Sequence, residues 1–183
     1  NDADPLARGV PRAAEAGFTL LGAPIVNIPF SRDAVNNRVE KIAAIFDLLP
    51  SLNDADAEFK MLRICLSFPK MTYCLRTCDP SELKPIYDSF DSLQLTSFST
   101  ILGRPLTQSA RLQAFLPVKI GGTGLRSAAA TAAAAFIASI AHTKSLVNSL
   151  LPIEVSHRSL DAAFPLLQIS TGNASYSSLD LLP

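Results

Sequence analysis

The glycines that follow Val118 are the residues whose spacing first indicates chemistry. The stretch VKIGGTGLRSAAATAAAAFIASIA joins an apolar run to a long alanine-rich segment through Gly121, Gly122 and Gly124. A glycine-rich turn that leads into a helix is typical of phosphate-binding sites, because the N–H groups at the helix start point toward the ligand. The stretch therefore raises the question of a nucleotide site.

The turn departs from both common nucleotide-binding motifs. A dinucleotide fingerprint needs a third glycine where this chain has Ser127, and an acid about twenty residues later. The next acid is Glu154. A P-loop ends in Gly-Lys-Ser/Thr, but Gly124 is followed by Leu125. The sequence therefore argues against a nucleotide-dependent enzyme, and we expect no small-molecule substrate.

Other side chains that could perform catalysis lack suitable neighbours. A serine or cysteine nucleophile needs a nearby base, and His142 and His157 belong to no nucleophile motif. Carboxylates gather at Asp54, Asp56 and Glu58, where acids are expected at the positive end of a helix. We predict no catalytic residue, no metal site and no cofactor in this chain.

Three cysteines indicate the compartment. Cys65, Cys74 and Cys78 are an odd number within one short region, which is not a disulfide framework. We expect buried, reduced thiols in an intracellular protein, nuclear or cytoplasmic. The polar start, NDADPLARG, is neither a signal nor a transit peptide, and we interpret it as a cut from a longer polypeptide.

Charge is distributed unevenly along a chain whose formal net charge is zero. No acid occurs between Asp91 and Glu154. A segment without acids can line a polyanion, or it can be a buried region that is simply poor in acids, and both interpretations remain open. The cations of this segment are Arg104, Arg111, Lys119, Arg126 and Lys144.

The elements that must position these residues are mostly helical. Apolar side chains recur at three- and four-residue spacing from Val35 to Leu49, and similar stripes follow further along the chain. The sequence predicts a mainly α protein, a helical bundle with a short β-turn or hairpin near its N-terminus. The expected divisions are 1–17 as a linker or frayed edge, 18–31 as a strand and turn, 32–150 as the helical bundle, and 151–183 as a weakly patterned tail.

Local signals predict where these helices begin and end. Asp54 or Asp56 can cap one helix, and Pro69 should split it. Asp79, followed by a proline, is expected to cap the next helix. A short helix is predicted at 107–115, with Leu112 and Phe115 as its buried anchors.

The alanine-rich segment is long enough to resemble a membrane span. Ala, Ser and Thr contribute little insertion energy, and His142 and Lys144 close the apolar run. We predict instead a buried helix that runs to about Ser149 and allows neighbouring helices to approach closely.

Several blocks, in order, resemble the non-LTR retrotransposon reverse transcriptases. LPVKIGGTGLRSA, at residues 116–128, is similar to the glycine block that follows the polymerase core in that family. GFTLLGAPI, at residues 17–25, resembles the hairpin after the catalytic palm, and residues 62–91 resemble a helix pair of these proteins. The resemblance spans residues 18–150.

The resemblance implies the thumb and connection region of an RNA-directed DNA polymerase, a helical bundle that holds the template–primer duplex. Leu21 and Gly22 match the grip turn and would face the primer end. The residues that match the glycine block are Gly121, Gly122, Gly124 and Arg126.

The family's catalytic aspartates lie upstream of the grip turn, so the resemblance implies that this chain is inactive alone and that Mg²⁺ belongs to a missing core. Phosphate contacts are expected from Arg104, Arg111, Lys119 and Arg126, with an RNA/DNA duplex or the rest of a larger polypeptide as partner. The alternative is a retroelement-derived structural subunit with no nucleic-acid role, which the zero net charge and the missing tryptophans favour.

Overall fold

The computed structural model describes residues 17–25, 27–150 and 163–168. Most of the predicted linker and most of the predicted tail, with His157, lie outside these residues. In the described part the chain is mainly helical with one antiparallel hairpin near its start, which confirms the predicted fold class. The elements are β1 (Phe18–Leu20), β2 (Ala23–Ile25), α1 (Ile28–Phe46), the 3₁₀-helix η2 (Leu49–Leu52), α2 (Ala55–Lys60), the π-helix η3 (Met61–Leu66), α3 (Phe68–Thr77), α4 (Lys84–Ile101), α5 (Gln108–Ala114), the 3₁₀-helix η4 (Val118–Ile120) and α6 (Ala128–Leu150).

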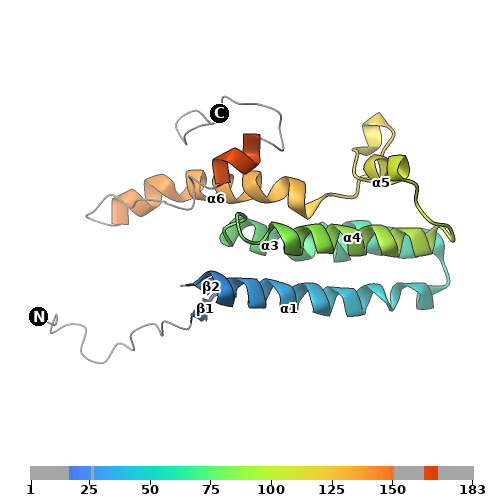
Figure 1. Ribbon diagram of the computed structural model, residues 1–183, viewed down its shortest axis with the longest axis horizontal. Coiled ribbons are helices and arrows are strands. Elements are labelled where there is room, and N and C mark those ends of the chain that lie inside the picture. Colours follow the sequence, from blue (N-terminus) through green and yellow to red (C-terminus); the bar gives the residue numbers. More distant parts are fainter. Residues whose placement is uncertain (1–16, 26, 151–162, 169–183) are drawn as a thin grey trace, which may run out of the picture.

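The helices pack in three tiers (Figure 1). α1 forms one outer tier, α3 and α4 lie in the middle, and α6 crosses over both of them on the other side. One core cluster joins all three tiers, and a smaller cluster joins α6 to the short helix at 163–168 through Phe136, Ile137 and Phe164. α5 and η4 project at one end of the bundle.

α1 begins and buries its apolar stripe as the sequence predicts. The side chain of Asn27 accepts a hydrogen bond from the Phe30 N–H at 2.7 Å, and Pro29 occupies the first turn, where its missing N–H costs nothing. The predicted inward face is confirmed, because the buried residues of this helix are Val35, Val39, Ile42 and Phe46.

The second helical segment is capped and split as predicted. Asp54 caps α2 by accepting from the backbone N–H groups of Asp56 and Ala57. Pro69 lies in the first turn of α3, after the π-helix has ended at Leu66. The split follows because proline has no N–H to continue the helical ladder.

The predicted start of α4 is wrong by several residues. Asp79 does not cap the helix, because its carboxylate accepts from the backbone N–H and the hydroxyl of Ser81 at 2.9 Å and 2.6 Å. These bonds stabilise a local turn. The helix begins only at Lys84, where Pro85 supplies the first-turn proline.

Two side chains expected to be buried are exposed. Leu112, predicted as an anchor of α5, is 66% exposed, whereas Ala114 is buried and Phe115 packs against the core. α5 is too short to present a long stripe, and only its C-terminal end faces the bundle. Cys65 is also exposed, while Cys74 and Cys78 are buried as expected.

α6 confirms the long helix but is only partly buried. Its buried residues end at Ile137, and Leu146 and Leu150 are exposed near its C-terminus. By length and composition alone, this helix could cross a membrane, and 22% of its apolar 18-residue stretch is buried. The absence of a membrane span therefore stays a prediction.

Candidate nucleic-acid interface

Leu21 and Gly22 form the tip of the β-hairpin. Leu20 lies opposite Ala23, so only these two residues make the turn. Their φ angles are 50° and 86°, and two successive positive values match the tight type I′ hairpin turn. This backbone is unfavourable for leucine, and the side chain of Leu21 is 91% exposed. The chain therefore maintains an exposed apolar side chain where asparagine or glycine would be more stable.

A hydrogen bond from Tyr73 links the hairpin tip to α3. The Tyr73 hydroxyl donates to the carbonyl of Leu21 at 2.8 Å. The tyrosine ring lies 3.7 Å from where a Cβ on Gly22 would stand. Sequence reasoning missed Tyr73, because no residue pattern pairs a helical tyrosine with a turn 52 residues earlier.

The three glycines of the glycine block have two different physical roles. Gly121 and Gly124 have φ angles of 87° and 76°, in the left-handed region that favours glycine. Gly122 is needed for space, because a Cβ there would stand 2.0 Å from the carbonyl oxygen of Leu116. Backbone geometry alone therefore explains all three glycines.

Internal hydrogen bonds close the glycine block into a compact loop. Gln113 donates to the carbonyl of Gly121 at 2.8 Å, and the hydroxyl of Thr123 donates to the carbonyl of Ala114 at 2.7 Å. Arg63 donates to the Thr123 carbonyl at 3.3 Å, which links the loop to η3. Many of the loop's polar groups are thus bonded within the chain.

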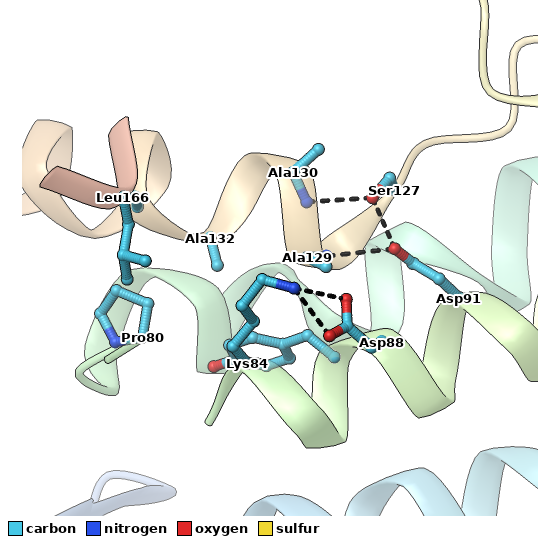
Figure 2. Close-up of a pocket in the computed structure, with 11 residues that line it drawn as sticks. Pro80, Lys84, Asp88, Asp91, Ser127, Ala129, Ala130, Ala132 and Leu166 are labelled. Atoms are coloured by element: carbon cyan, nitrogen blue, oxygen red, sulfur yellow. Dashed lines mark hydrogen bonds and ion pairs between the residues drawn. The ribbon is translucent and has the colours of Figure 1, made fainter. Parts of the chain in front are cut away.

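The N-terminus of α6 already holds an anion, the carboxylate of Asp91. This side chain accepts from the Ser127 hydroxyl and from the backbone N–H of Ala129 at 3.2 Å (Figure 2). It also accepts from the backbone N–H of Ala128 at 2.7 Å. Gln94 donates to the same carboxylate at 3.0 Å. These are the N–H groups that would meet a phosphate, so the structure offers no phosphate cradle there.

Burial governs the protonation of Asp91. Removal from water raises the pKa of its carboxyl, and the hydrogen bonds from Ser127, Ala128 and Ala129 lower it by less. The position at a helix N-terminus favours the ionised form through the helix dipole. Asp91 is therefore a structural capping residue whose charge is costly to bury.

A pocket of about 340 Å³ lies beside Asp91, between α4 and α6 (Figure 2). Alanines of α6 and Leu166 form its apolar walls. Lys84 is its one cation among the described residues, and it is paired with Asp88 at 2.7 Å. The pocket therefore lacks a free charge for a phosphate.

The four predicted phosphate-contacting cations are all available at the surface. Arg104, Arg111, Lys119 and Arg126 are exposed, and none forms an ion pair with a carboxylate of the described residues. The guanidinium of Arg126 lies 5.5 Å from the ring centroid of Phe68, a cation–π contact that orients it without neutralising it.

The structure places the predicted residues in two separate groups. The hairpin tip with Leu21 and Gly22 lies at one end of the bundle, and α5 with η4 projects at the opposite end (Figure 1). Arg104, Arg111 and Lys119 lie in or beside these projecting elements. Any ligand that contacts both groups must extend along the bundle.

Asp91 and Gln94 are buried polar residues that were not predicted as site residues from the sequence. Both lie in the buried stripe of α4, three residues apart, and both contact the start of α6. The signal for them was present, because a polar pair inside an apolar stripe requires partners. In the described residues, no three His, Cys, Asp or Glu side chains gather to hold a metal ion.

Comparison with known proteins points to a mobile genetic element. The chain is 36% identical over 66 residues to the retrotransposable element SLACS 132 kDa protein of Trypanosoma brucei gambiense. The match covers 36% of this chain and 6% of that protein, so the chain spans a small part of its relative's length. No family model and no solved structure matches. The similarity supports a retrotransposon origin.

Proposed function

We propose that this chain is a non-catalytic, thumb-like part of an RNA-directed DNA polymerase that grips a template–primer duplex through its backbone phosphates. The observation that carries the proposal is the group of exposed cations without ion pairs on a segment free of acids. Such a surface attracts a polyanion and positions it without reading its sequence. The retrotransposon similarity is consistent with this role.

The hairpin tip adds a second contact. A strained backbone that persists at an exposed position is a reason to look for function, and Leu21 is such a position. We assign its side chain to the terminal base pair of the duplex, where an apolar surface can stack. The tie from Tyr73 would hold the tip in place for that contact.

The test is fluorescence anisotropy with a short RNA/DNA duplex at low salt. Replacing Arg111 or Lys119 with glutamine should weaken binding several-fold, because each change removes a phosphate contact. Arg32→Gln is the matched control, since Arg32 is exposed but already paired with Glu82 at 3.1 Å. Equal effects of all three changes, or no binding by the unaltered chain, would contradict the proposal.

A separate variant tests the hairpin tip. Leu21→Asn should keep or raise stability, because asparagine accepts the left-handed conformation more readily, and should weaken binding to a duplex that has a primer end. Binding to a closed hairpin duplex with no free end should not change. Unchanged affinity for both ligands would remove Leu21 from the interface.

The second candidate function is a structural subunit of a larger assembly without nucleic acid. Large apolar side chains are exposed around α5 and η4, namely Leu102, Leu112, Leu116, Val118 and Ile120. Exposed apolar patches of this kind mark protein contacts. Failure of the unaltered chain to bind the duplex in the same titration would favour this function.

A further inference from the structure

An open apolar groove of about 480 Å³ lies between α2, the C-terminal end of α4 and the loop that carries η4. Its lining includes Phe59 and Phe98, whose ring centroids are 5.3 Å apart. Leu102 and Val118 also line it and are 42% and 61% exposed. An open apolar groove flanked by such side chains is suited to an apolar anchor.

Arg63 contributes a positive charge to this groove. Its guanidinium lies 5.7 Å from the ring centroid of Phe59 and donates to the Thr123 carbonyl at 3.3 Å. A guanidinium has five N–H donors, and no described carboxylate pairs with Arg63. Asp56, the one acid among the described residues that line the groove, is paired with Lys60. A partly buried cation with unused donors is complementary to a carboxylate.

We propose that this groove binds a peptide segment of a protein partner that presents an apolar side chain beside an acidic one. The apolar side chain would enter between Leu102 and Val118, and the carboxylate would pair with Arg63 in a bidentate manner. A nucleic-acid duplex fits this groove poorly, because it offers phosphates but no apolar anchor. The inference is independent of duplex binding by the neighbouring cations.

The experiment is a selection of short random peptides displayed on phage against the full chain, followed by titration of the enriched peptides. Enriched sequences should combine apolar and acidic residues. Arg63→Gln and Val118→Asp should each weaken their binding about tenfold. Leu48→Asp is the matched control, because Leu48 is 65% exposed but does not line the groove.

The outcomes separate this inference from its rivals. Failure to enrich any peptide, enrichment of peptides without acids, or equal binding by the Val118 and Leu48 variants would overturn it. Displacement of the peptides by a duplex, with the Arg63 variant weakening the duplex to the same extent, would assign the groove to nucleic acid and also overturn it. Thermal melting of each variant identifies losses caused by unfolding.

Discussion

Asp91 is the residue on which the junction between α4 and α6 depends. Its carboxylate accepts from two backbone N–H groups at the start of α6, that of the buried Ala128 and that of the half-buried Ala129. Loss of a cap typically costs 0.5–2 kcal/mol, and a buried donor without a partner adds to that cost. This residue should therefore contribute strongly to the stability of α6.

Asp91→Ala should lower the free energy of unfolding by about 2 kcal/mol, because both N–H groups lose their acceptor. Asp91→Asn should cost less, since one amide oxygen can still accept from Ala128. Urea denaturation followed by circular dichroism measures both values. If the alanine variant is no less stable than the asparagine variant, the carboxylate is not the cap described above.

The buried carboxyl of Asp91 should also make stability depend on pH. Because burial raises its pKa in the folded state, its contribution is fully present below the unfolded pKa and is lost as pH rises through the folded value. The free energy of unfolding of the unaltered chain, minus that of Asp91→Asn, should decrease as pH rises from below 3.8. A difference that stays constant or grows with pH would contradict a raised pKa of Asp91 in the folded state.

At the scale of the element, the glycines of the glycine block have different structural roles that a sequence motif does not reveal. The sequence placed a tight turn there correctly, but Gly121 and Gly122 look alike in a motif. In the fold, one has a left-handed backbone and the other is pressed against Leu116. The two glycines should therefore respond differently to substitution.

Gly122→Ala should destabilise the chain by several kcal/mol, because its Cβ would overlap the Leu116 carbonyl and force the loop open. Gly121→Ala is the control and should cost about 1 kcal/mol, since it meets only the left-handed penalty in open space. Hydrogen exchange at the Gly124 N–H, which bonds to Leu116 at 3.0 Å, reports on the loop directly. Equal protection in both variants would refute the distinction.

The helices were predictable from spacing, whereas their ends and partners depended on tertiary contacts. The stripe of α1 follows from its three- and four-residue repeat, which local sequence encodes fully. The start of α4 was misplaced, because Asp79 had a competing hydrogen bond to Ser81. The exposure of Leu112 was missed, because a two-turn helix has no repeat long enough to reveal its buried side.

At the scale of the whole molecule, a zero net charge conceals a cationic segment. The candidate cations could be singled out from the sequence, because acids are absent between Asp91 and Glu154. The separation of Arg104, Arg111 and Lys119 from the hairpin tip could not be predicted, since it depends on how α1 and α4 pack. The charge pattern and the packing together define an elongated surface rather than a single pocket.

Binding to a duplex should weaken as salt concentration rises. Each phosphate contact contributes a slope of about −0.9 in a plot of log affinity against log salt for B-DNA, so four contacts give a slope of roughly −3.6. Arg104→Gln should reduce the magnitude of the slope by about one contact. Anisotropy titrations at several salt concentrations measure it, and a slope near zero would exclude phosphate binding.

The cap at α6 has one more consequence, since Asp91 acts as an anion that the chain supplies to itself. Removing it with Asp91→Ala leaves a small vacancy that faces the N–H groups of Ala128 and Ala129, and formate is small enough to enter it. We expect formate to raise the melting temperature of this variant in a saturable way, and to leave the unaltered chain unaffected. Such chemical complementation would show that this helix start binds a free carboxylate once its own side chain no longer occupies it.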